Sequence, residues 1–149
     1  MQEQIERDLK AALLAGDKQK TEILKGIKNA LQYETVAQNA RDNGLSEEQS
    51  QKVLLRESKK RSEAAKLYES VGENKRAEAE LHEKEIIDSF LPKQATDQEI
   101  SDVVKDELVK ISNPTAADMG IIIGAVRGRL GAGADGGTIS KFVREALSS

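Results

Sequence analysis

Aliphatic side chains recur three, four and seven positions apart along most of the chain, which is the spacing of an amphipathic helix. Leu24, Ile27 and Leu31 are typical of the pattern. The one β-branched run, Ile121–Ile123, lies inside such a helical repeat and does not predict a strand. The pattern predicts seven helices, covering approximately residues 2–14, 17–40, 46–70, 73–90, 96–111, 115–130 and 136–147.

Local start signals support these boundaries. Ser46 with Gln49, and Thr96 with Glu99, form the capping-box pattern, in which two residues exchange side-chain and backbone hydrogen bonds at the start of a helix. Asp17 is a favourable residue at the start of the second helix. These signals predict where the second, third and fifth helices begin.

The same signals predict how the chain is divided. Pro92 follows the fourth helix and cannot continue it. We expect an all-α protein with a helical hairpin or bundle region at residues 1–91 and a small three-helix bundle at residues 96–149. The stretch LPKQA, residues 91–95, is the predicted connection.

The fourth helix carries the only histidine. Ala79, His82, Ile86 and Phe90 share one face of this helix, so we expect His82 to be a structural residue on the apolar side. Nothing in the sequence positions a nucleophile beside it. No catalytic residue is therefore assigned.

Composition narrows the functional classes. Of 149 residues, 33% are charged and 3% aromatic, and the net charge is −3. The protein as a whole is therefore not a basic nucleic-acid-binding protein, and such binding needs a local patch. The absence of cysteine excludes a thiolate nucleophile and a cysteine-bound metal. Because histidine pairs at metal-ligand spacing are also absent, we expect no metal and no cofactor.

Targeting signals are not evident. No apolar run approaches the roughly 18 residues of a membrane span. The opening stretch MQEQIERDLKAALLAGD is amphipathic and acidic, unlike a signal or transit peptide. We therefore expect a soluble cytoplasmic protein without a membrane partner.

Leu130–Ser140, LGAGADGGTIS, is rich in glycine. Its first three glycines fit G-x-G-x-x-G, but a dinucleotide-binding loop needs a strand before the first glycine, and here a helical repeat precedes it. The stretch also approaches the phosphate-loop pattern G-x-x-x-x-G-K-T, with Gly137 at the lysine position. The sequence therefore predicts a joint between two helices, in which Asp135 caps the second.

Small residues also recur every four positions within the sixth helix, at Ala116, Gly120, Gly124 and Gly128. Each internal glycine costs up to about 1 kcal/mol of helix propensity relative to alanine. Either another helix of the chain or a ligand backbone, such as a phosphate chain, could compensate by close approach. Of the two, intramolecular packing is the expectation.

Basic residues flank the glycine-rich joint and are candidates to hold phosphates, together with backbone N–H groups at the start of the last helix. The candidate contacts are the side chains of Arg127, Arg129, Lys141 and Arg144 and the backbone around Gly133, Asp135, Gly136 and Gly137. A solvated surface explains the spacing of the four side chains equally well.

A second basic cluster lies in the third helix. Its members are Arg56, Lys59, Lys60 and Arg61. Acidic residues flank the cluster, so we expect a solvated helix face.

Three segments resemble the YqeY family: SFLPKQATDQEI, ADMGIIIGAV and ADGGTISKFVREAL, residues 89–100, 117–126 and 134–147. The stretch DLKAALLAGDKQKTEILKGIKNAL, residues 8–31, is similar to the opening of that family. The resemblance spans nearly the whole chain, and its most specific part is L-P-K-Q, a capping box and then D-M-G-x-x-x-G-A. It implies an all-α fold with a helical N-terminal part and a small three-helix C-terminal part.

The resemblance also implies a role. The YqeY (GatB/YqeY) family is similar to the tail domain of the B subunit of the glutamyl/aspartyl-tRNA amidotransferase, which helps to hold tRNA while catalysis occurs elsewhere. This chain resembles that tail without the catalytic core. An amidotransferase label, as a carbon–nitrogen ligase with glutamine as amide donor, would be inherited from the family, since no amidase nucleophile or ATP site is visible.

The chain departs from the family pattern at the joint. The family usually has a lysine and an arginine before A-D-G and a lysine directly after D-G. Gly131, Gly133 and Gly137 occupy these positions here. Arg127 and Arg129 lie about one turn earlier and are candidates to replace the missing charges.

Three functional hypotheses follow. The first is a non-catalytic accessory protein, related to tRNA-dependent amidation, whose C-terminal unit binds tRNA or tRNA-like RNA. The second is a protein-interaction module without RNA binding, whose small-residue stripe receives a helix of a translation-related partner. The third is an amide-transferring enzyme that uses His82, and the sequence supports it least.

Overall fold

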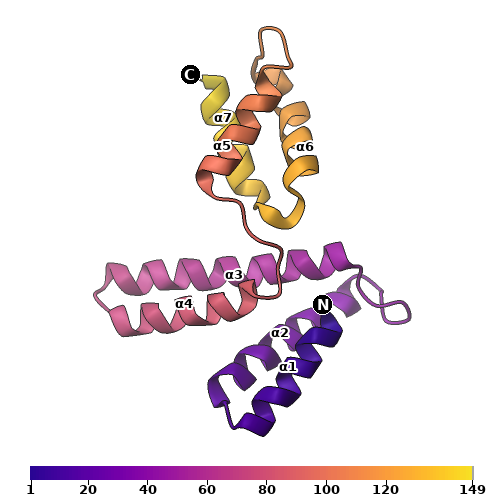
Figure 1. Ribbon diagram of the computed structural model, residues 1–149, viewed down its shortest axis with the longest axis vertical. Helices are drawn as coiled ribbons and strands as arrows, with labels where there is room; N and C mark the ends of the chain where they lie inside the picture. Colours follow the sequence, from indigo (N-terminus) through magenta and orange to yellow (C-terminus); the bar gives the residue numbers. More distant parts are fainter. Residues whose placement is uncertain (149) are drawn as a thin grey trace. The chain divides into compact units, whose positions relative to one another are not determined.

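The computed structural model describes residues 1–148, in which the chain forms seven α-helices and no strand. The all-α prediction is therefore confirmed. The helices are α1 (Gln2–Ala15), α2 (Lys18–Ala37), α3 (Glu47–Ser70), α4 (Asn74–Asp88), α5 (Asp97–Leu108), α6 (Met119–Leu130) and α7 (Gly136–Ser148), as Figure 1 shows. The last residue of the predicted C-terminal bundle, Ser149, lies outside the described residues.

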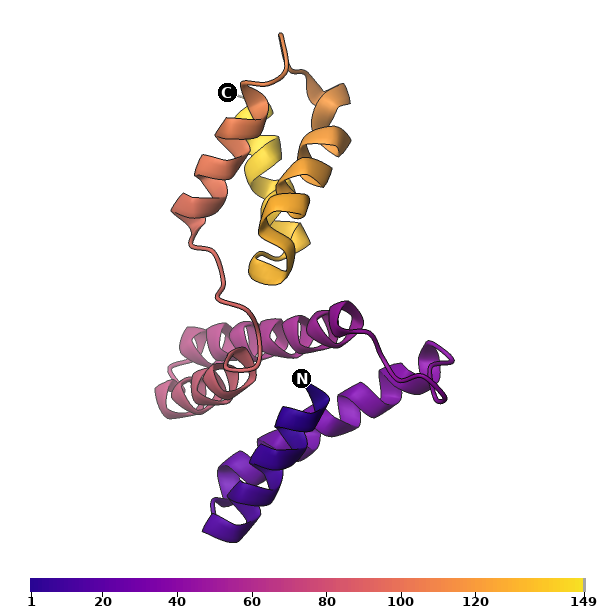
Figure 2. The same ribbon diagram turned by 45° about the vertical axis from the view of Figure 1, so that its right-hand side comes forward.

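The chain divides into two compact units, residues 1–91 and the part that begins at Pro92. In the N-terminal unit, α1 pairs with α2, and the shorter α4 pairs along its length with α3 (Figures 1 and 2). α2 also contacts both α3 and α4. The buried core side chains of this unit are Ile5, Ala12, Leu24, Ile27, Leu31, Val53, Leu54 and Ile87.

The predicted helix starts are confirmed by their hydrogen bonds. The Ser46 hydroxyl accepts from the Gln49 N–H at 3.1 Å, and the Gln49 side chain accepts from the Ser46 N–H at 2.9 Å. Thr96 and Glu99 form the same reciprocal pair at the start of α5. Asp17 caps α2 by accepting from a backbone N–H at 3.1 Å.

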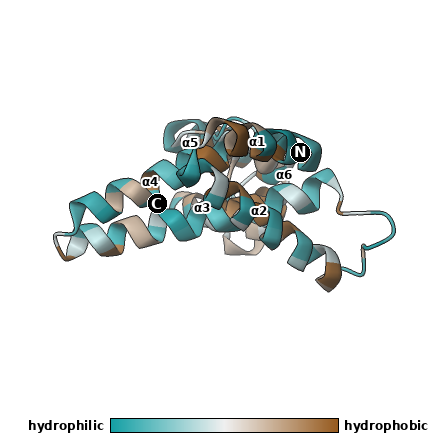
Figure 3. Cartoon of the chain, turned by 90° about the horizontal axis from the view of Figure 1, so that it is seen from below, coloured by the Kyte–Doolittle hydropathy of each residue, from teal (hydrophilic) through white to brown (hydrophobic). Residues whose placement is uncertain are grey.

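The predicted buried face of α4 is wrong for two residues. Ala79 and His82 are exposed, and 52% of the His82 side chain is accessible. Ala77 and Ile87 are buried in their place. The reason is the polar contact between α4 and α3, two helices whose residues are mostly hydrophilic (Figure 3). An apolar stripe therefore does not identify the inward face of α4.

Two arginines of the basic cluster in α3 form ion pairs with neighbouring helices, one with α4 and one with α2. Arg61 lies 3.4 Å from Glu80 and 3.3 Å from Glu83 of α4. Arg56 donates to Glu34 of α2 at 3.0 Å. The expectation of a solvated helix face is confirmed for Arg56, whose side chain is 60% exposed, and holds less well for Arg61, which is 39% exposed. Both arginines nevertheless tie α3 to its neighbours.

The C-terminal unit is a three-helix bundle in which α5, α6 and α7 contact one another. A capping box between Thr115 and Asp118 starts a short 3-10 helix, η1 (Ala116–Asp118), which continues into α6. The buried side chains of this unit are Ile100, Val104, Ile122, Val126, Ala134, Ile139 and Val143. Within residues 1–148, no helix is both long and apolar enough to cross a membrane.

Candidate nucleic-acid interface

The glycine-rich stretch is a joint between α6 and α7, as the sequence predicts. Gly131 follows α6 with φ +53° and ψ −132°, a conformation that strains any residue with a β-carbon. Asp135 then starts α7, because its Oδ2 accepts from the Thr138 N–H at 3.2 Å. Since a helix and not a strand precedes this stretch, it is not a dinucleotide-binding loop.

The connection before α5 is docked on this joint. The Ala95 N–H donates to the Gly133 carbonyl at 2.6 Å, and the Gln94 side-chain amide donates to the Ala132 carbonyl at 2.9 Å. Gly133 is buried, and a β-carbon there would lie 3.4 Å from the Lys93 carbonyl oxygen. Gly133 therefore makes room for the connection, and it does not offer an open surface to a phosphate.

Arg127 reaches from the last turn of α6 to the start of α7. Its guanidinium lies over Gly136, since a β-carbon on that glycine would be 3.3 Å from Nη2 and 3.5 Å from Cζ. Arg127 is exposed and forms no hydrogen bond or ion pair within residues 1–148. The N–H groups at a helix start carry partial positive charge. The Arg127 charge therefore adds to a positive potential at this point.

Two more cations continue from this point along α7. Gly137, Lys141 and Arg144 are four and three positions apart, so they lie on one face of the helix. All three are exposed, and neither basic side chain has a carboxylate partner among the described residues. We call Arg127, Gly136, Gly137, Lys141 and Arg144 together the basic site.

Two carboxylates lie close to the basic site in the sequence. Asp135 precedes it and caps α7, and Glu145 is exposed directly after Arg144. Among these sequence neighbours, three cations stand against two anions. The local excess contrasts with the net charge of −3 of the whole chain.

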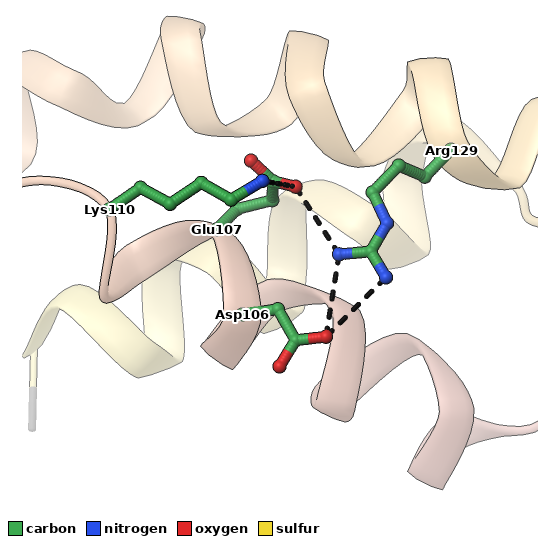
Figure 4. Close-up of polar contacts among 4 residues, drawn as sticks. All are labelled: Asp106, Glu107, Lys110 and Arg129. Atoms are coloured by element: carbon green, nitrogen blue, oxygen red, sulfur yellow. Dashed lines mark hydrogen bonds and ion pairs between the residues drawn. The ribbon is translucent and has the colours of Figure 1, made fainter.

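Arg129 has a different role from Arg127. It lies 3.4 Å from Asp106 and 3.3 Å from Glu107 of α5 (Figure 4). Lys110 donates to the same Glu107 carboxylate at 2.9 Å. Arg129 thus links α6 to α5, and its charge is already matched by two carboxylates. We therefore do not include it in the basic site.

Glu107 is the centre of this network and is only 8% exposed. The hydrogen bond from Lys110 lowers the pKa of its carboxyl, and Arg129 lowers it further. Burial acts in the opposite direction, because it penalises the charged form. The two cations prevail, so Glu107 stays ionised to lower pH than a free glutamate.

The small-residue stripe of α6 does not face another helix. Ala116, Gly120, Gly124 and Gly128 are all exposed. A β-carbon on any of the three glycines would meet nothing within 4 Å. The expectation of intramolecular packing is therefore wrong, and no contact within the described residues compensates for the helix propensity that these glycines lose.

The surroundings of His82 do not resemble a catalytic centre. Its Nδ1 lies 3.9 Å from the Glu85 carboxylate one turn away, and both side chains are exposed. Within residues 1–148, histidine and carboxylate side chains form no group that could hold a metal ion. The basic site is thus the arrangement with the clearest chemistry, a set of exposed cations without carboxylate partners beside a helix start.

Comparison with known proteins adds one finding. A family model described as Yqey-like protein matches residues 2–147, which is nearly the whole chain. Among curated proteins, nothing matches the chain.

Proposed function

The chain belongs to the YqeY-like family, and from this premise we propose that it is a non-catalytic accessory protein that binds tRNA or a tRNA-like RNA. The ligand lies on the C-terminal unit, with its phosphates at the basic site. The observation that carries the proposal is the unpaired Arg127 guanidinium over the first residue of α7. The choice of tRNA rests on the resemblance to the amidotransferase tail domain.

The chemistry of the site suits a phosphate. The N–H groups of Gly136 and Gly137 have no acceptor within the described residues, and such groups at a helix start bind anions readily. Arginine can form two parallel hydrogen bonds with a phosphate group. Lys141 and Arg144 extend the positive surface along α7, as a polymer of phosphates requires.

Salt dependence of tRNA binding tests the proposal. Each phosphate contact releases counterions, so removing three cations should make the negative slope of log K against log salt shallower by about 2 to 3. The variant is Arg127→Gln/Lys141→Gln/Arg144→Gln. Its control is Lys10→Gln/Lys59→Gln/Lys66→Gln, which removes the same charge from exposed lysines of the N-terminal unit that have no ion pair among the described residues. Equal losses of tRNA affinity and of salt dependence in both triple variants would refute the site.

The exposed α6 stripe favours one alternative, a protein-interaction module. Its glycines would let a partner helix approach closely, and Ile121 beside them is 69% exposed. A pull-down from lysate, with and without ribonuclease, separates the two functions. Partners that survive ribonuclease and are lost on Gly124→Leu would favour the module, whereas partners lost with ribonuclease favour RNA binding.

A further inference from the structure

We infer that Lys93 is a further phosphate-binding residue of the basic site, although α5 and most of α6 separate it from Arg127 in the sequence. The inference rests on the proposed function and adds a residue that the sequence patterns leave in a plain connection. It follows from the way that this connection is held on the joint between α6 and α7.

The backbone on both sides of Lys93 is anchored. The Gln94 side-chain amide donates to the carbonyls of Pro92 at 3.0 Å and Ala132 at 2.9 Å. The Ala95 N–H donates to the Gly133 carbonyl at 2.6 Å. The Lys93 carbonyl itself lies 3.4 Å from the position of a Gly133 β-carbon. Residue 93 is therefore fixed beside the joint and does not swing as a free linker.

This position is within reach of the start of α7. Gly133 and Gly136 are three residues apart, so they are separated by at most about 11 Å even if the chain between them is extended. Lysine carries three donors on a flexible four-carbon stem, which covers much of that distance. Lys93 can therefore contact the phosphate held at Gly136 or the next one along the strand.

The Lys93 side chain is also free to do so. It is exposed, and within residues 1–148 it forms no hydrogen bond or ion pair. With it, the cations of the site become four: Lys93 on the connection, Arg127 on α6, and Lys141 and Arg144 along α7. Such an arrangement contacts several phosphates in series, as a nucleic-acid strand presents them. Four cations are more than one inorganic phosphate needs.

The test compares Lys93→Gln with Lys105→Gln in the full chain. Lys105 is an exposed lysine of α5 without an ion pair among the described residues, so its variant has the same charge change in the same unit. The equilibrium constant for tRNA is measured between about 50 and 200 mM salt. We expect Lys93→Gln to lower the affinity several-fold and to reduce the salt slope by about 0.7 to 0.9, the loss of one phosphate contact.

Arg127→Gln, measured in parallel, separates the two proposals. If Arg127→Gln weakens binding while Lys93→Gln behaves like Lys105→Gln, Lys93 lies outside the site and the proposed function stands. If neither Arg127→Gln nor Lys93→Gln changes binding, both proposals fall. Thermal denaturation of each variant shows that the fold is intact, which we expect because both lysines are exposed.

Discussion

The Arg127 guanidinium lies over the backbone of Gly136, with Nη2 only 3.3 Å from the place of a β-carbon on that glycine. The negative end of α6 favours a cation in the last turn of that helix, but the positive end of α7 disfavours it there. No carboxylate of the described residues pairs with this guanidinium. Arg127 therefore remains available to an anion, and two predictions follow from its contrast with Arg129.

Arg127→Gln should lower tRNA affinity about tenfold, which corresponds to about 1.4 kcal/mol. The free energy of unfolding should change by no more than about 0.5 kcal/mol, as for surface residues without partners. Binding titrations and chemical denaturation measure the two quantities. A loss of stability without a loss of affinity would show that Arg127 is structural.

Arg129→Gln should give the opposite result. It removes a partner of Glu107, which is 8% exposed, and leaves that carboxylate with Lys110 alone. We expect a lower midpoint of thermal denaturation and little change in tRNA affinity beyond the loss of one distant charge. Equal affinity losses for Arg127→Gln and Arg129→Gln would mean that the ion-pair network opens when RNA binds.

Glu107 should make stability depend on pH. Its pKa lies below the ordinary value of 4.5 in the folded protein, so the unfolded chain binds the proton more tightly. The stabilisation from the Glu107 carboxylate is therefore complete above about pH 4.5. It is lost as the pH falls through the lower pKa of the folded protein. We expect Glu107→Gln to be less stable than the wild type near pH 6 and the difference to shrink as the pH falls below about 4.5. A difference that does not vary with pH would contradict this account.

Asp135 combines a cap with an unfavourable charge for the proposed ligand. Asp135→Asn keeps a good capping side chain and removes the negative charge beside the basic site. We expect the free energy of unfolding to fall by at most about 1 kcal/mol, because the charge no longer interacts with the α7 dipole. We also expect a several-fold gain in tRNA affinity. Asp135→Ala, which also removes the cap, should cost about 0.5 to 2 kcal/mol. Weaker binding by the folded Asn variant would indicate that Asp135 itself contacts RNA.

Two glycines in or beside α6 should respond to alanine with opposite signs. Gly124→Ala should stabilise the protein by about 0.5 to 1 kcal/mol, because its β-carbon would meet nothing within 4 Å. Gly131→Ala should destabilise it by about 1 to 3 kcal/mol, because the φ of residue 131 is +53°. Chemical denaturation of both variants tests the prediction. If Gly124→Ala is destabilising, the α6 stripe has a packing partner.

The sequence predicts those features of the fold that depend on neighbouring residues. The capping boxes at Ser46 and Thr96 and the cap at Asp135 each need only four consecutive positions, and all three caps are present. The prediction that the His82 face of α4 points inward is wrong. Arg61 of α3 pairs with Glu80 and Glu83, so the inward side of α4 is polar. Hydrophobic periodicity does not detect an ion pair between helices.

The candidate site was predictable only in part for the same reason. Arg127 and Arg129 are two positions apart in the sequence, and only the structure shows that one is free and the other engaged with α5. Lys93 was not a candidate, because its place beside Gly133 depends on contacts between residues about forty positions apart. Its one sequence signal is its position in the L-P-K-Q motif.

The most direct test is a nitrogen–proton correlation spectrum of the labelled protein as tRNA is added at low salt. The eleven glycines report on separate surfaces. Gly136 and Gly137 lie in the basic site, Gly120, Gly124 and Gly128 on the α6 stripe, and Gly16, Gly26, Gly44 and Gly72 in the N-terminal unit. We expect the signals of Gly136 and Gly137 to shift or broaden first. Changes confined to the stripe or to the N-terminal unit, with Gly136 and Gly137 unaffected, would contradict the proposed site.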